Sequence, residues 1–121
     1  EHYVRIQPAK QHLRDEFLKS SFYLMTSNTE CYPMFLLEAM DCGLPIVTYD
    51  SPTGPRNIVT HDVDGFVVAY DDDALLVEKI VFLMQNESHR ILMGQKAVQK
   101  AASFSVHKVM AQWETLFKAL K

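Results

Sequence analysis

The segment that most constrains the fold is residues 44–50, Leu-Pro-Ile-Val-Thr-Tyr-Asp, which is mostly apolar. A strand with one face in water alternates apolar and polar residues, whereas a parallel strand covered by helices on both faces has a continuous apolar run. Further strands are predicted over 3–7, 21–27 and 66–70. Helices are predicted over 10–19 and from about 33 to 41. This alternation of strands and helices implies βαβ units and therefore a parallel sheet.

Beyond residue 70 only helices are predicted, over 74–85, 87–103 and 105–121, each with apolar residues at helical spacing. We expect these three helices to pack as one layer on the sheet. Four short strands are fewer than a doubly wound domain usually has, and a chain of 121 residues supports one core. The expected fold is therefore α/β, a Rossmann-like parallel sheet with flanking helices, forming one partial domain over residues 1–121.

The charge balance limits the partners. The sequence has 12 Lys and Arg against 15 Asp and Glu, a net charge of −3, and no basic cluster compensates. Nucleic acid is therefore an unexpected partner. The five histidines are scattered without the spacing of metal ligands, so no metal site is predicted.

The cysteines and the hydropathy indicate the compartment. Cys31 and Cys42 fit neither a zinc spacing nor a disulfide framework and are expected to be free thiols in a reducing environment. No apolar run is long enough to span a bilayer, so a cytoplasmic location is expected. Lys96 and Lys100 share a predicted helix face that could contact an anionic membrane in a longer protein, although a solvated face is the simpler interpretation.

The first candidate site is the segment 29–40, in which Glu30 and Glu38 stand eight positions apart in an apolar run. A proline precedes Met34 and Phe35, so their amides are expected in the first turn of a helix, without an intrahelical acceptor and suited to a phosphate. Because apolar residues surround Glu38, we expect it to be buried and to need a partner. A nucleotide-sugar, with hydroxyls on both sides of a diphosphate, fits this layout. The structural alternative is that Glu30 caps the helix and Glu38 bonds a neighbouring group.

Two further stretches, 52–58 and 71–73, follow predicted strands, where ligands bind in an open parallel sheet. Residues 52–58 are expected to form a turn, and the functional alternative is a close backbone approach to a ligand at Gly54 with Arg56 as an anion contact. The three aspartates at 71–73 are expected to cap the next helix rather than to hold a divalent cation. The Asp-Val-Asp-Gly at 62–65 lacks the remaining acids of a calcium loop and is expected to be a turn.

Residues 27–59 resemble the donor-binding domain of the retaining glycosyltransferases of family 4 (group 1), which have the two-domain GT-B architecture. The residues in register with the family's pattern are Ser27, Glu30, Tyr32, Pro33, Glu38, Ala39, Gly43 and Pro45. The similarity continues through Asp-Gly-Phe-Val-Val at 64–68, Arg90, Met93, Gly94, Ala97, the Phe-Ser pair at 104–105 and Trp113. It therefore covers nearly the whole chain.

The resemblance implies the C-terminal, nucleotide-sugar-binding part of an enzyme that transfers a hexosyl group. In the family, the residue at Glu30 binds the donor sugar and the residue at Glu38 binds the ribose. The resemblance implies these further donor-binding residues: Cys31, Tyr32 and Pro33 along the sugar, and the amides of Met34 and Phe35 at the diphosphate. No catalytic residue is assigned, and neither a metal nor a cofactor is expected.

The same resemblance implies an acceptor, a saccharide or glycolipid in polysaccharide or lipopolysaccharide synthesis, held by an N-terminal domain. The 121 residues alone are therefore expected to be inactive. Two positions depart from the family's pattern: Cys31 stands where glycine is common, and Asn57 where glutamate is usual. Two other functions stay open, a nucleotide-sugar epimerase of the same architecture and a non-catalytic α/β module that binds a nucleotide or a protein.

Overall fold

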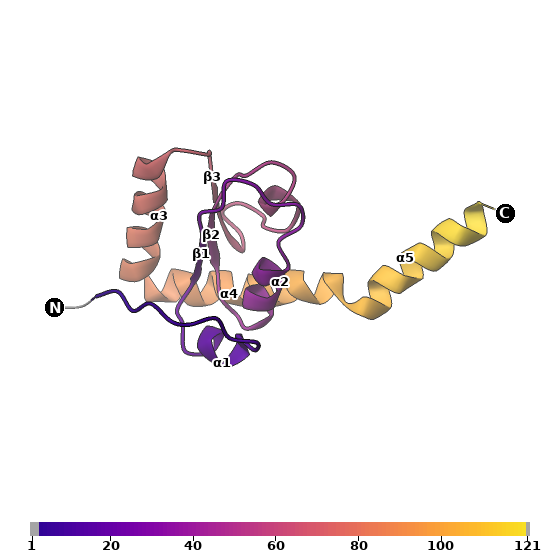
Figure 1. Cartoon of the computed structure of the whole chain (residues 1–121), viewed down its shortest axis with the longest axis horizontal. Helices are drawn as coiled ribbons and strands as arrows, with labels where there is room; N and C mark the ends of the chain where they lie inside the picture. The colour runs from indigo at the N-terminus through magenta and orange to yellow at the C-terminus, as the bar shows by residue number, and fades with distance from the viewer. Residues whose placement is uncertain (1–2, 121) are drawn as a thin grey trace.

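Three parallel strands form the centre of the molecule in the computed structural model, which describes residues 3–120. In the order in which they lie side by side, they are β1 (Tyr23–Met25), β2 (Ile46–Tyr49) and β3 (Gly65–Val68) (Figure 1). In this register, Val47 lies between Leu24 and Phe66. The prediction of a parallel sheet with flanking helices is confirmed.

The central strand β2 is buried at all four positions, as its apolar run predicts. Successive side chains point to opposite faces of the sheet and enter two separate cores. Ile46 belongs to the core under α2 (Met34–Asp41). Val47 belongs to the core under α3 (Asp73–Gln85), together with Leu83. The sheet is therefore covered by helices on both sides.

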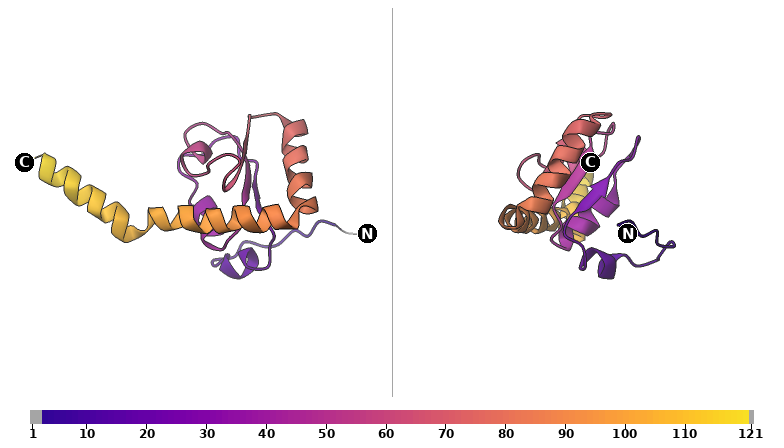
Figure 2. Two further views of the ribbon diagram at one scale, coloured as in Figure 1. Left: turned by 180° about the vertical axis from the view of Figure 1, so that it is seen from behind. Right: turned by 90° about the vertical axis from the view of Figure 1, so that its left-hand side faces the viewer.

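A long helix, α4 (Glu87–Ala101), runs across the molecule and contributes Ala97 to one core and Met93 to the other (Figure 2). At Gly94 this helix lies against the backbone just after α2, where an added Cβ would lie 2.2 Å from the carbonyl oxygen of Gly43. Gly43 follows α2 with φ of +82°, in the left-handed region that glycine adopts readily after the end of a helix.

The N-terminal segment differs from the prediction. Residues 3–10 have no regular secondary structure, so the strand predicted over 3–7 is wrong, and Ile6 is 95% exposed. A strand needs a neighbour that takes its backbone hydrogen bonds, and none of the strands that the structure describes lies beside this segment. The helix predicted over 10–19 is reduced to α1 (Arg14–Phe17).

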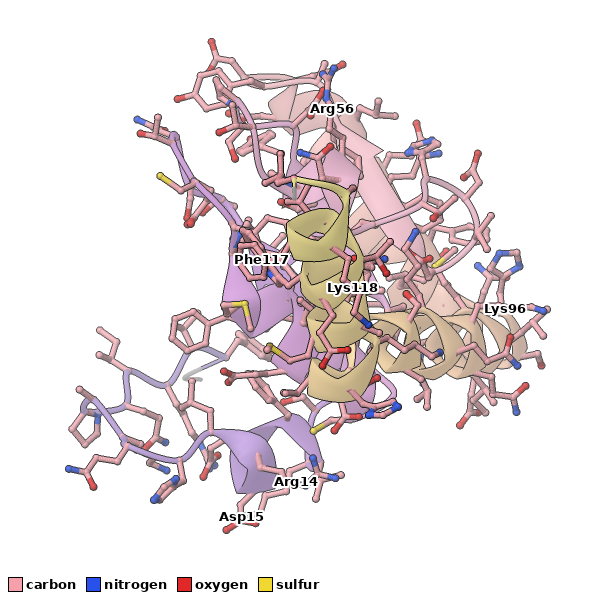
Figure 3. All side chains as sticks on the ribbon, turned by 90° about the vertical axis from the view of Figure 1, so that its right-hand side faces the viewer. Arg14, Asp15, Arg56, Lys96, Phe117 and Lys118 are labelled. Carbon is pink, nitrogen blue, oxygen red and sulfur yellow. The ribbon has the colours of Figure 1, made fainter. Side chains whose placement is uncertain are left out.

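Beyond β3 the described chain is helical, as predicted, with a short 3₁₀ turn η2 (Ala102–Phe104) between α4 and α5 (Val106–Ala119). The expected single layer is wrong for α5, which projects from the body and has no buried residue (Figures 1 and 2). The extended backbone of Ser105 turns the chain away from α4. Figure 3 shows Phe117, which is 58% exposed, and Lys118 on this outlying helix. Helical spacing predicts an apolar face on α5, but not what covers it.

Within residues 3–120, no helix combines the length and the apolar character that a membrane crossing requires.

Gly94 offers a direct test of how tightly α4 and α2 pack. We expect Gly94→Ala to lower the free energy of unfolding by about 1–3 kcal/mol, because the added methyl group must displace the backbone at Gly43. Gln95→Ala, at an exposed position of the same helix, is the control and should change stability by less than about 0.5 kcal/mol. Urea unfolding of both variants measures the difference. Equal stability of Gly94→Ala and the wild type would contradict this packing.

Candidate functional site

Two loops meet at the carboxyl edge of the sheet: the loop after β1, which carries Glu30, and the turn after β2, which carries Gly54. A Cβ added at Gly54 would lie 3.0 Å from the Cβ of Glu30 and 3.0 Å from the Cδ of Pro33. The φ of Gly54 is −113°, so its backbone conformation does not require glycine. Glycine is needed here because the two loops come so close together.

The N-terminus of α2 opens at the same edge. The helix was expected to begin at about Pro33. In the structure Pro33 has an extended backbone and immediately precedes the helix, which begins at Met34. Its carbonyl oxygen accepts a hydrogen bond from the amide of Leu36, 3.0 Å away. Within residues 3–120, the amides of Met34 and Phe35 have no acceptor and no side chain caps the helix. Free amides at a helix N-terminus, together with the helix dipole, suit an anion.

Glu30 lies in the loop before this helix end, and Glu38 lies one turn into the helix. Glu30 is half-buried and Glu38 is exposed, and neither carboxylate has a hydrogen bond or ion pair with any residue from 3 to 120. Burial raises the pKa of Tyr23, and the negative charges of Glu30 and Glu38 raise it further. Both carboxylates are therefore close enough to Tyr23 to affect its ionisation. The expected burial of Glu38 is wrong, because the helical period turns other residues toward the core: Leu36, Ala39 and Met40.

Each glutamate lines its own cavity. An open cavity of about 480 Å³ is lined by Thr29, Glu30, Cys31, Tyr32, Pro52 and Thr53. A second cavity, of about 510 Å³, lies between α2 and the segment 11–17, and Glu38 and Met34 are among its lining residues. One carboxylate-lined cavity therefore involves the loop before α2, and the other runs along α2 itself. Their carboxylates offer hydrogen-bond acceptors for hydroxyl groups of a ligand that also reaches the free amides.

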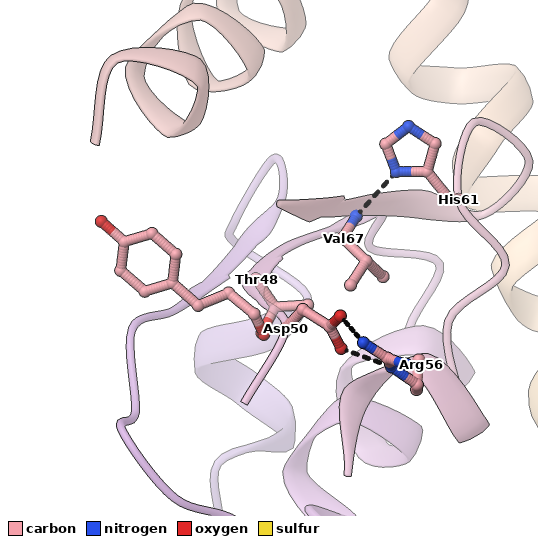
Figure 4. A network of polar contacts seen from close by, with 6 residues as sticks. Thr48, Asp50, Arg56, His61 and Val67 are labelled. Carbon is pink, nitrogen blue, oxygen red and sulfur yellow. Dashed lines mark hydrogen bonds and ion pairs between the residues drawn. The ribbon is translucent and has the colours of Figure 1, made fainter. Parts of the chain in front are cut away.

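Both arginines near these cavities are already engaged. Arg56 forms a two-pronged ion pair with Asp50, and this carboxylate raises the pKa of the guanidinium (Figure 4). Arg14 forms an ion pair with Asp41, with 2.9 Å between the nitrogen and the oxygen. In the view of Figure 3, Arg14 lies far from Arg56. Arg56, a candidate anion contact from the sequence, therefore holds the turn after β2 closed. Asp50 was not among the residues predicted from the sequence, although an acid six positions before an arginine, across a turn with Pro52 and Gly54, is a usable signal.

The third candidate stretch is structural. The Asp72 side chain accepts a hydrogen bond from the amide of Leu75 at 3.0 Å, so the expected helix cap is confirmed. The Asp-Val-Asp-Gly segment forms the expected turn, in which Asp64 accepts from the Thr60 amide at 2.8 Å. Burial raises the pKa of the Asp64 carboxyl. In the part of the chain that the structure describes, no group of His, Cys, Asp and Glu could hold a metal ion.

These features define an α/β domain with a polar site at the carboxyl ends of parallel strands. The sequence profile described as "Glycosyl transferases group 1" matches residues 2–100. Because the match covers most of the chain, this chain belongs to the group 1 glycosyltransferases.

Two curated relatives illustrate the similarity. An exopolysaccharide phosphotransferase of Streptomyces coelicolor is 36% identical over 118 residues, which cover 97% of this chain and 12% of the relative. An amylovoran biosynthesis glycosyltransferase of Erwinia amylovora is 30% identical over 111 residues, which cover 92% of this chain and 31% of the relative. The chain therefore spans less than a third of either relative.

A solved structure supports the fold. A mutant of TarM from S. aureus, in complex with fondaparinux, alpha-GlcNAc-glycerol and UDP, matches with a TM-score of 0.78 at 22% identity, over 87% of this chain and 22% of that one. The architecture is that of GT-B glycosyltransferase domains.

Gly54 provides a test of the contact between the two loops. We expect Gly54→Ala to lower the free energy of unfolding by about 1–2 kcal/mol, because its Cβ would press on Glu30 and Pro33. The alkylation rate of the exposed Cys31 should change as well, because this residue follows Glu30 in the displaced loop. Urea unfolding and mass spectrometry of the Cys31 peptide measure the two effects.

Pro52→Ala is the control for Gly54→Ala, since Pro52 is exposed in the same turn. Unchanged stability and alkylation in Gly54→Ala would show that the loops separate freely.

Proposed function

We propose that this chain is the nucleotide-sugar-binding part of a retaining glycosyltransferase of family 4. In this proposal, residues 1–121 are a partial domain, the C-terminal donor-binding part of a two-domain GT-B enzyme. The enzyme transfers a hexosyl group to a saccharide or glycolipid acceptor in polysaccharide or lipopolysaccharide synthesis. The observation that carries the proposal is the set of unpartnered groups at α2: the amides of Met34 and Phe35, the Glu30 carboxylate in the loop before them and the Glu38 carboxylate one turn into the helix.

In this proposal the donor is oriented with its sugar toward Glu30 and its ribose toward Glu38. The diphosphate lies against the amides of Met34 and Phe35, where the positive end of the helix dipole favours it. The sugar occupies the cavity lined by Glu30, whose carboxylate accepts hydrogen bonds from sugar hydroxyls. The ribose occupies the cavity lined by Glu38. The TarM mutant is in complex with UDP, a nucleoside diphosphate, and this ligand of a protein with the same fold supports this class of donor.

The same amides can assist the reaction. When the bond from the anomeric carbon to the diphosphate breaks, negative charge grows on the leaving diphosphate. Fixed amide dipoles that already point at this position stabilise that charge without reorganising. Cys31, Tyr32 and Pro33 line the sugar side and orient the donor in this scheme. The acceptor hydroxyl and any group that activates it come from the other domain.

The two glutamates should have separable roles in the full-length enzyme. Glu38→Gln keeps the size of the side chain but removes a charge-assisted hydrogen bond to ribose, which contributes roughly 1.5–3 kcal/mol. Donor and free nucleoside diphosphate should both bind about ten- to a hundredfold more weakly. Glu30→Gln should leave the affinity for the free nucleoside diphosphate nearly unchanged and lower turnover of the intact donor. Calorimetry and initial rates measure the two effects.

Equal loss of nucleotide affinity in both variants would contradict the assignment of one acid to each end of the donor. No change in either variant would mean that both acids are structural. It would then favour a non-catalytic module, as would a full-length protein that ignores every nucleotide-sugar in a titration.

The isolated chain should not transfer sugar. Catalysis needs donor and acceptor held together, and in this proposal the acceptor side belongs to another domain. We expect residues 1–121 alone to give no glycosylated product, while the full-length enzyme gives product under the same conditions. Product analysis by mass spectrometry with a radiolabelled donor tests this. Turnover by the isolated chain above the hydrolysis of donor in buffer would show that the site is self-contained.

A second candidate reaction comes from the Streptomyces coelicolor relative, which is named a phosphotransferase. An enzyme that transfers a sugar together with its phosphate forms a bond from the acceptor oxygen to the sugar-side phosphorus, breaks the P–O bond from that phosphorus to the bridging oxygen, and releases a nucleoside monophosphate. A glycosyltransferase breaks the bond to the anomeric carbon and releases a nucleoside diphosphate. Chromatography of the released nucleotide distinguishes the two reactions.

A further inference from the structure

The turn after β2, residues 50–57, holds an unusual backbone conformation beside the donor site. Thr53 has φ of +69°, in the left-handed region that β-branched residues rarely adopt. Such a conformation persists only where the surroundings enforce it, and it is often found at functional sites. Here the Asp50–Arg56 ion pair closes the turn, and the Asn57 amide nitrogen donates to the Thr53 carbonyl oxygen at 2.9 Å.

Thr53 in turn contacts the loop that carries Glu30. Its hydroxyl oxygen lies 3.0 Å from the Glu30 carbonyl oxygen and 2.7 Å from the Pro52 carbonyl oxygen, so one proton serves two acceptors. The neighbouring Gly54 packs against Glu30 from the same turn. The Glu30 carboxylate itself has no partner among residues 3–120 that would fix its position. The backbone of Glu30 is therefore held from the turn, while its side chain stays available.

We propose that Thr53 and Asn57 are positioning residues, which hold the backbone at Glu30 so that its carboxylate meets the donor sugar. This inference rests on the proposed function and adds a route of action: Asn57 restrains Thr53, and Thr53 restrains Glu30. A shift of about 1 Å in a group that contacts substrate can lower a rate by up to about a hundredfold, so a modest restraint of this kind matters.

The inference also explains the departure at position 57, where the family that this sequence resembles usually has glutamate. An ionised glutamate only accepts hydrogen bonds, whereas the Asn57 amide nitrogen can donate to a carbonyl oxygen. In this chain the Thr53 carbonyl oxygen is the acceptor. Asn57→Glu should therefore impair the enzyme, even though it restores the residue that the family commonly carries.

The test uses the full-length enzyme and two isosteric variants. Thr53→Val removes the hydroxyl at nearly constant shape, and Asn57→Asp removes the amide donor. We expect each to lower kcat/KM for the nucleotide-sugar about tenfold, within the range that misplacement causes, and to leave the Kd of the free nucleoside diphosphate within twofold of wild type. Thr53→Ser keeps the hydroxyl and should restore most of the activity. Thr115→Val, at an exposed threonine of α5 that bonds within its own helix, is the matched control.

A double-mutant cycle identifies the route. If Thr53 acts through Glu30, then Thr53→Val should change kcat/KM by less than twofold in a Glu30→Gln background. A tenfold loss in both backgrounds, or an equal loss of nucleotide affinity, would overturn the proposal and assign Thr53 a general structural role. Wild-type activity in Thr53→Val and Asn57→Asp would overturn it too, while leaving the donor site intact. A wild-type enzyme that binds no nucleotide-sugar would instead refute the proposed function.

Discussion

The structure depends on the burial of β2 from both faces. Its side chains enter two cores, so a single four-residue strand ties α2 and α3 to the same sheet. Each fully buried apolar side chain of this size contributes about 1.5–3 kcal/mol relative to exposure. Because β2 pairs in parallel with both neighbours, the strands end at one common edge. The loop after β1 and the turn after β2 therefore meet there without any further element to bring them together.

The sequence predicts those parts of the fold that a local pattern determines by itself. The apolar run of β2, Gly43 at the end of α2 and the Asp72 cap of α3 are of this kind. The place of the Gly54 turn beyond a strand end followed from the rule for parallel sheets, whereas its close approach to Glu30 is seen only in the structure.

The wrong predictions share a cause: in each case the structure depends on which other parts of the chain lie beside the segment, and the local sequence does not show this. Residues 3–7 alternate like a strand, but no described strand takes their hydrogen bonds. Glu38 has apolar neighbours in sequence, yet the helical period turns it to solvent with Met34. The apolar face of α5 is real, but its packing depends on the direction that the chain takes after Ser105. The left-handed conformation of Thr53 depends on several contacts at once, within residues 50–57 and with the Glu30 loop.

The charges at the site limit how a diphosphate could be held. Arg14 and Arg56 are each neutralised by an aspartate, while Glu30 and Glu38 carry unpaired charge near the start of α2. The end of a helix offers the equivalent of about half a positive charge, which is less than a diphosphate carries. Arg56 could turn to a phosphate only by leaving Asp50, whose side chain is 20% exposed and would lose its partner. The described residues therefore suit the neutral, hydroxyl-rich ends of a nucleotide-sugar better than its charged centre. In the proposed enzyme, the remaining positive charge has to come from groups that face this edge from outside the two ion pairs.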